Sequence, residues 1–104
     1  MNKYILFLIA IVILTIGLSG VFVIEHENAH REIDIHHGCE DAIITYGFSA
    51  AHTMGVNCVD NLNRDVLNSQ NEIVGYNVVC VMFTIILCTA VIGMLILNNE
   101  SNKE

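Results

Sequence analysis

Two long apolar runs without a charged residue constrain this chain more than any other feature. They cover Tyr4 to Ile24 and Val78 to Leu97, and the second run has no charged residue back to Ile73. A helix rises ~1.5 Å per residue, so about 20 apolar residues cross the ~30 Å hydrocarbon core of a bilayer. We therefore predict two transmembrane helices with a polar segment between them.

The predicted fold is an all-α membrane protein, an antiparallel hairpin of two transmembrane helices with a small polar cap. Residues 1–24 hold the first transmembrane helix, residues 25–72 the polar cap, residues 73–97 the second helix and residues 98–104 a polar tail. The main alternative for the first run is a secretory signal peptide, because Lys3 gives a basic start and small residues follow in "GLSG". The run is longer than a usual signal core, so a membrane span is favoured.

Within the cap, glycine and asparagine mark the expected turns. The first helix is expected to continue to about His36 and to stop near Gly38, and the second to begin near Asp65. Ala42 to Val56 is rich in β-branched and aromatic residues, which predicts one or two short strands. A loop or short helix around Ser49 to Met54 is an equal alternative.

The charge distribution excludes some partners and weakly favours one orientation. Residues 25–72 carry nine of the eleven acidic residues but only two arginines, so no surface suited to nucleic acid is expected. Lys3 and Lys103 lie in the two tails, and we predict that both termini are cytoplasmic. Cys39 and Cys58 then form a disulfide if the cap is extracytoplasmic, and remain thiols if it is cytoplasmic.

The pentapeptide His26-Glu27-Asn28-Ala29-His30 has the pattern HExxH. On a helix, His26 and His30 lie one turn apart on the same face, so both imidazoles can bind one Zn²⁺ ion. Glu27 can then act as general base toward a water molecule whose pKa the metal lowers. The alternative is a solvated, histidine-rich turn beside the membrane.

A catalytic zinc site needs a third protein ligand, and three residues are candidates. His36 lies six residues after His30, which is about 600° along a helix and therefore the wrong face. His52 lies near glycines but has no selective spacing. Glu72 directly precedes the second span, so in an antiparallel hairpin it arrives at the same level as His26 and His30.

HExxH on one helix, followed by "NE" on a later helix, resembles the gluzincin zinc peptidases. The resemblance implies that Glu72 is the third zinc ligand, with Asn71 preceding it as in that family. Gluzincins usually have an acidic residue shortly after this ligand that orients a histidine, but this chain has Gly75 and Tyr76 there. That orienting role is then expected from one of three aspartates, and an oxyanion-stabilising role from one of two further residues. The aspartates are Asp34, Asp60 and Asp65, and the oxyanion candidates are Tyr76 and His52.

Two functions follow as hypotheses. The first is a membrane-embedded zinc metallopeptidase that hydrolyses peptide bonds of a peptide or membrane protein near the bilayer surface. The second is a non-catalytic membrane protein, either metal-binding or an accessory subunit. A pore-forming protein is disfavoured, because the polar residues within the spans are few and mild.

Overall fold

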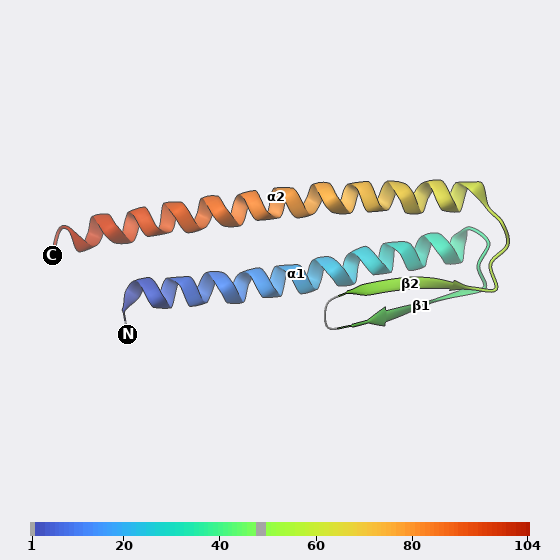
Figure 1. The fold of residues 1–104 in the computed structure, drawn as a ribbon, viewed down its shortest axis with the longest axis horizontal. Helices are drawn as coiled ribbons and strands as arrows, with labels where there is room; N and C mark the ends of the chain where they lie inside the picture. The colour runs from blue at the N-terminus through green and yellow to red at the C-terminus, as the bar shows by residue number, and fades with distance from the viewer. Residues whose placement is uncertain (1, 48–49) are drawn as a thin grey trace. The chain divides into compact units, whose positions relative to one another are not determined.

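A computed structural model describes residues 2–47 and 50–104 of the chain, and its elements follow the order helix, hairpin, helix (Figure 1). Helix α1 covers Lys3–His36, strand β1 Asp41–Tyr46, strand β2 Ala51–Val56 and helix α2 Leu62–Ser101. The predicted pair of long helices is confirmed, with a two-stranded antiparallel hairpin between them. The alternative of a loop or short helix is wrong for residues 51–54, which belong to β2; Ala50 precedes that strand, and Ser49 lies outside the described residues.

Helix α1 ends at His36, two residues before Gly38, as the sequence predicts. Gly38 has φ +98°, a conformation that costs glycine little and strains other residues. The backbone N–H of Cys39 donates to the carbonyl oxygen of Asp34 at 3.0 Å, the hydrogen bond expected where a helix closes on a left-handed residue. The chain therefore leaves α1 in a fixed direction toward the hairpin.

The hairpin is an antiparallel pair in which Asp41 lies opposite Val56 and Tyr46 opposite Ala51. Side chains alternate between the two faces of a strand, so Thr53 shares a face with Ala42, which is buried. A disulfide joins Cys39 to Cys58 at the end of the hairpin remote from its turn. A Cβ at Gly55 would collide with the sulfurs of both cysteines, so this position requires glycine.

Helix α2 begins three residues earlier than predicted, at Leu62 instead of Asp65. Asn61 caps it, because its side-chain Oδ1 accepts the backbone N–H of Arg64 at 3.1 Å. At its other end α2 continues to Ser101, so most of the predicted polar tail is helical. Both helices run without interruption through the predicted boundaries at residues 24 and 73.

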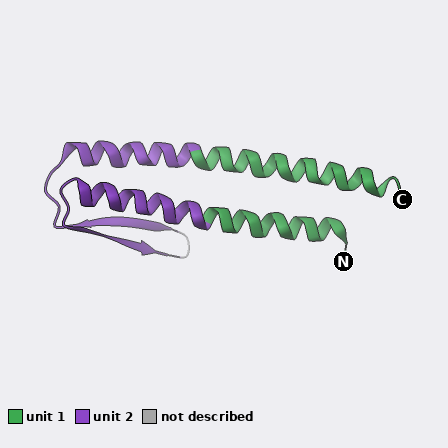
Figure 2. Ribbon diagram, turned by 180° about the vertical axis from the view of Figure 1, so that it is seen from behind, with its two compact units in different colours: residues 1–19, 78–104 green, residues 20–77 purple. Residues whose placement is uncertain are grey.

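The chain forms two compact units (Figure 2). One unit holds residues 1–19 and 78–104, where Tyr4 donates to Ser101 at 3.1 Å and the ring of Phe7 packs on Gly93. The other unit holds residues 20–77, which include the hairpin and the adjoining turns of α1 and α2. Within each unit the two helices are antiparallel neighbours, since the numbering rises along one as it falls along the other.

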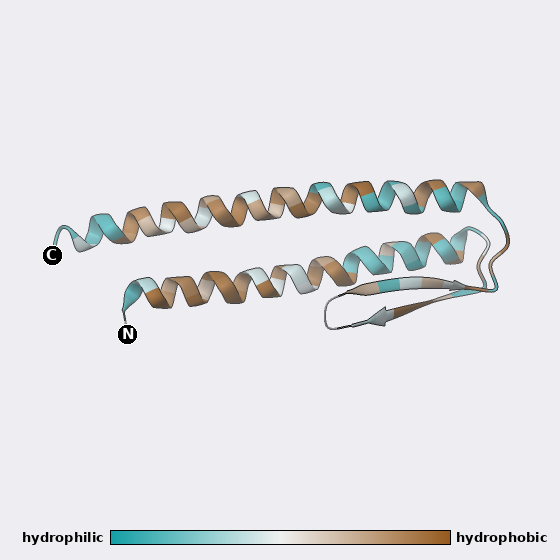
Figure 3. Ribbon diagram, in the orientation of Figure 1, coloured by the Kyte–Doolittle hydropathy of each residue, from teal (hydrophilic) through white to brown (hydrophobic). Residues whose placement is uncertain are grey.

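Both helices are long and apolar enough to cross a membrane. Hydrophobic residues dominate the N-terminal part of α1 and the C-terminal part of α2, whereas polar residues gather near the hairpin (Figure 3). None of the residues in the most apolar window of either helix is buried within the protein. These apolar side chains are therefore on the outside of the folded chain.

Candidate metal centre

Three side chains from the two helices meet at one point within residues 20–77. His26 and His30 project from the same face of α1, one turn apart, and Glu72 projects from the facing turn of α2. The two imidazoles are mostly buried, with side-chain exposures of 15% and 12%, whereas the Glu72 carboxylate is half-exposed. The two histidines are therefore largely shielded from solvent, whereas Glu72 leaves the site open to solvent.

The ligand atoms of these residues lie at spacings that suit one small cation. The Nε2 atoms of His26 and His30 are 3.3 Å apart, and Glu72 Oε1 lies 3.3 Å from the first and 2.7 Å from the second. Two ligands each about 2.0 Å from a tetrahedral zinc ion lie about 3.3 Å apart. Two of the three separations match that spacing. The third is a hydrogen-bond distance and would widen by about 0.6 Å on zinc binding.

A hydrogen-bonded chain orients the imidazole of His30. Its Nδ1 lies 2.7 Å from Asn68 Oδ1, and Asn68 Nδ2 donates to Asp34 Oδ1 at 2.9 Å. Because the amide nitrogen of Asn68 is engaged with Asp34, its oxygen faces His30 and only accepts, so His30 Nδ1 carries the proton. This leaves Nε2 of the neutral ring as the atom that can bind a metal, which is the usual arrangement for a histidine ligand.

Neighbouring residues fix both the imidazole and the backbone of His26. The Phe22 ring stacks on it with centroids 5.6 Å apart, and Asn71 Nδ2 donates to the backbone oxygen of His26 at 3.4 Å. Gly75 of α2 is buried against the same ring. A Cβ there would lie 2.8 Å from Cε1 and 2.9 Å from Nδ1 of His26, so α2 can approach this ligand only where it lacks a side chain.

The charges around the site favour a cation. Burial raises the pKa of Glu72, but in the metal-free site the hydrogen bonds that protonated His30 and His26 donate to it, together with their charge, outweigh this, so that its pKa lies below the ordinary value. Glu72 is thus ionised at neutral pH. Asp34 and Glu27 are both buried nearby, and the closest basic side chain along α1, Arg31, extends toward Glu32 and Asp41.

Glu27, the predicted general base, is held by the hairpin. Only 6% of the residue is exposed, and Thr53 Oγ1 lies 2.7 Å from its Oε2 and 3.1 Å from its backbone oxygen. Among residues 2–47 and 50–104, no group donates to the other carboxylate oxygen, Oε1. The hairpin therefore fixes one oxygen of Glu27 beside His26 and leaves the other without a protein partner in that part of the chain.

We call His26, His30 and Glu72 the triad. The other sequence-predicted residues lie apart from it. His36 is exposed and pairs with Glu32 at 3.2 Å, as its place on another helix face predicts. His52 is exposed and, by strand alternation, lies on the hairpin face opposite Thr53. Of the three aspartates, Asp34 reaches His30 through Asn68, whereas Asp60, Asp65 and the exposed Tyr76 make no hydrogen bond to His26 or His30.

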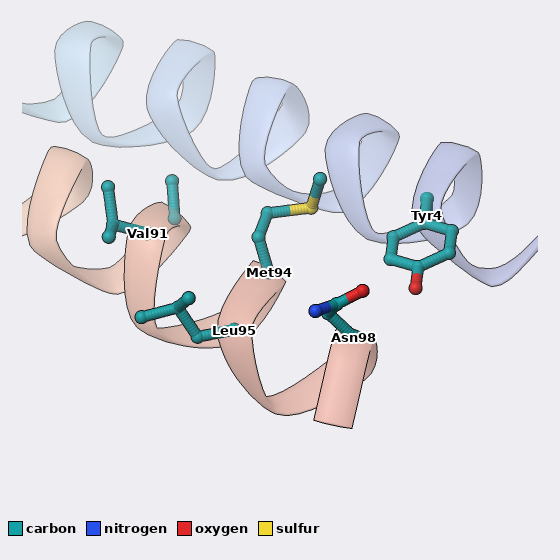
Figure 4. A pocket seen from close by; sticks show the side chains of 6 residues that line it. Tyr4, Val91, Met94, Leu95 and Asn98 are labelled. Carbon is teal, nitrogen blue, oxygen red and sulfur yellow. The ribbon is translucent and has the colours of Figure 1, made fainter. Parts of the chain in front are cut away.

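A separate pocket of about 480 Å³ lies within the other unit (Figure 4). Tyr4 of α1 and Asn98 of α2 contribute its polar atoms, and Val91, Met94 and Leu95 line the rest. The Tyr4 hydroxyl is engaged with Ser101. None of the triad residues lines this pocket, and its aliphatic lining suits hydrocarbon better than a polar reactant.

Sequence reasoning missed Asn68, Thr53 and Gly75 as parts of the site. Asn68 carries a usable signal, because it precedes Glu72 by four residues and therefore shares its helix face. Comparisons with protein-family models, curated proteins and solved structures found no match. The chemistry of the site therefore rests on the side chains themselves.

Proposed function

We propose that this protein is an integral membrane zinc metallopeptidase that hydrolyses peptide bonds near the membrane surface. The observation that carries the proposal is the convergence of His26 Nε2, His30 Nε2 and Glu72 Oε1 within 3.3 Å of one another, with the buried Glu27 next to His26 in the sequence. Two imidazoles and one carboxylate are a ligand set that catalytic zinc sites use, with a further position open for water. The half-exposed Glu72 supports an open position of this kind.

The roles of the chain's residues follow from their surroundings. A zinc ion held by the triad would act as a Lewis acid toward water and toward the scissile carbonyl. Glu27 takes the proton of the attacking water through its unpartnered Oε1 and delivers it to the leaving nitrogen, as the resemblance to gluzincins implies. Thr53 keeps the carboxylate in place during both transfers, and Asn68 keeps His30 in the metal-binding tautomer.

The membrane setting is supported by composition and by the position of the site in the sequence. His26 follows the first apolar run by two residues, and Glu72 directly precedes the uncharged stretch that begins at Ile73. A disulfide between Cys39 and Cys58 favours an oxidising compartment for residues 25–72, and hence cytoplasmic termini. A peptidase of this form would act on peptides or membrane proteins at the extracytoplasmic surface.

The test combines metal content with hydrolysis by the detergent-purified protein. Elemental mass spectrometry should find about one zinc per chain in the wild type and none in His30→Ala or Glu72→Ala. Glu27→Gln retains an oxygen that can accept from Thr53, so it should keep zinc but lose cleavage of a quenched fluorescent peptide library. Glu25→Gln, an exposed glutamate on the same helix, serves as the matched control and should retain both. A wild type free of zinc under zinc-replete conditions would overturn the proposal.

A non-catalytic metal-binding protein is the second candidate, and the contact between Glu27 and Thr53 favours it. Fastening the hairpin to α1 is a sufficient structural reason for a buried carboxylate bonded to a hydroxyl, without any catalytic role. In that case wild type and Glu27→Gln would both hold zinc, and neither would cleave any peptide in the library.

A further inference from the structure

The hairpin stands out from the rest of the cap because it lacks charge. Residues 25–72 hold nine acidic residues, yet the 18 residues from Ala42 to Val59 contain no Asp, Glu, Lys or Arg. Acidic residues flank this stretch directly, with Glu40 and Asp41 before it and Asp60 after it. The hairpin therefore has a polar base and an uncharged body.

Contacts with α1 define the direction in which the hairpin points. Near its base, Asp41 lies 3.6 Å from Arg31, and the site of a Cβ on Gly55 is 3.4 Å from Asp34. Further along β2, Thr53 contacts Glu27. The residues of α1 that contact the hairpin therefore lie progressively closer to Ile24 as the strands approach their turn. Figure 1 shows the two strands lying along α1 in this direction.

The turn end of the hairpin therefore reaches the level of the apolar run of α1. Ala51 lies two residues beyond Thr53, which is about 7 Å along a strand. The same distance along α1 is roughly four or five residues, from Glu27 back to Val23. Tyr46, paired with Ala51, consequently lies beside the last turn of the predicted span.

The exposed apolar side chains of the hairpin lie in a narrow zone near the end of this apolar run. Ile43 and Met54 lie opposite each other on one face of the hairpin and Tyr46 lies on the other face, with Thr53; all three apolar side chains are exposed. By the same rises, the Ile43–Met54 pair lies within about 8 Å of the level of Ile24. The headgroup layer on each side of a ~30 Å core is about 5–7 Å thick. An exposed tyrosine at the core boundary is typical of residues that anchor proteins in this layer.

We propose that the turn end of the hairpin is a lipid-contacting element, which inserts Tyr46 into the interface of the bilayer that α1 spans and brings the Ile43–Met54 face against the headgroups. We assign lipid as the partner of this surface for two reasons. The surface lies at the level where the apolar run of α1 ends, and the charged residues of the hairpin are confined to its opposite end. The inference rests on the membrane insertion proposed above and not on the zinc chemistry. Its consequence is that Thr53, and with it Glu27, is held relative to the membrane surface.

Single tryptophans test the proposal, because the chain contains none of its own. Four variants of the full-length protein are prepared: Ile13→Trp, Tyr46→Trp, Ile43→Trp and Val59→Trp. Each is reconstituted in two sets of phosphatidylcholine vesicles, whose acyl chains carry bromine near the headgroup end in one set and near the bilayer centre, where Ile13 is expected, in the other. Ile13 lies within the apolar run of α1 and reports insertion of the span. Val59 is equally exposed, 64% against 65%, and lies beyond the base of the hairpin, which makes it the water-facing control. Retention of the Cys39–Cys58 disulfide, measured by intact mass, confirms folding.

The expected result is quenching and a blue-shifted emission for Tyr46→Trp, a smaller effect of the same kind for Ile43→Trp, and neither for Val59→Trp. If Ile13→Trp is quenched while Tyr46→Trp and Ile43→Trp behave like Val59→Trp, the hairpin inference is overturned and the membrane span stands. That outcome would leave the face for a protein partner. If Ile13→Trp is not quenched either, the membrane insertion fails and the inference fails with it.

Discussion

Gly75→Ala should weaken zinc binding while favouring the helix that carries the substitution. The new Cβ would lie 2.8 Å from Cε1 of His26. Carbon atoms pack at about 3.5–4.0 Å, so the imidazole or the backbone of α2 has to move by at least about 0.7 Å. Zinc–ligand distances tolerate about 0.2 Å. Because the Phe22 ring also stacks on His26, the displaced imidazole cannot keep its Nε2 at the triad.

The magnitude follows from comparable disturbances around metal ligands, which cost about 10–100-fold in affinity. That loss corresponds to about 1.4–2.8 kcal/mol of binding free energy. In the opposite direction, alanine favours a helix interior over glycine by about 0.8–1.0 kcal/mol. The metal-free protein can relax by rotating the ring of His26, so its stability should not fall as its zinc affinity does.

Zinc affinity is measured by competition with a chromophoric chelator, and helix content by circular dichroism, on protein in detergent. Gly20→Ala is the matched control, because a Cβ at Gly20 would meet nothing within 4 Å while the gain in helix propensity is the same. Equal zinc affinities for Gly75→Ala, Gly20→Ala and wild type would refute the assignment of His26 as a ligand in this geometry.

Three further predictions concern the supports of the site. Asn68→Ala should lower zinc affinity about 10–100-fold by releasing His30 Nδ1, as measured by the same chelator competition; an unchanged affinity would contradict the orienting role. Cys39→Ser should destabilise the protein by about 3 kcal/mol, because the disulfide closes a loop with a sequence separation of 19, and Cys58→Ser should cost the same in denaturant titrations. Asn61→Ala should cost about 1 kcal/mol in the same titration through loss of the helix cap, and a cost near zero would show that solvent caps α2 equally well.

The three triad residues were predictable because their placement depends on rules with a fixed period. The spacing of His26 and His30 is one helical turn, and the same period excludes His36. Glu72 joins them because the polar ends of two antiparallel helices meet at one level. Each of these steps uses distance along the chain, and none needs the packing of side chains.

The supporting residues were not predictable in the same way. Asn68 and Thr53 act through hydrogen bonds to other elements, which depend on the rotation of α2 and on the face that the hairpin turns toward α1. The sequence places the start of α2 too late because asparagine suits turns and helix caps equally, and Asn61 is a cap. The Cys39–Cys58 pairing stayed open because the sequence does not reveal the redox compartment.

The two buried carboxylates give the strongest physical reason to expect a cation at the triad. Glu27 and Asp34 are 6% and 7% exposed, and burying an ionised carboxylate costs several kcal/mol unless opposite charge lies nearby. In residues 2–47 and 50–104 neither forms an ion pair with Lys or Arg; Glu27 is bonded to Thr53 and Asp34 to Asn68. Both hydrogen-bond partners are neutral. A divalent ion held by His26, His30 and Glu72 would place positive charge within the same unit, so we expect zinc to stabilise the cap.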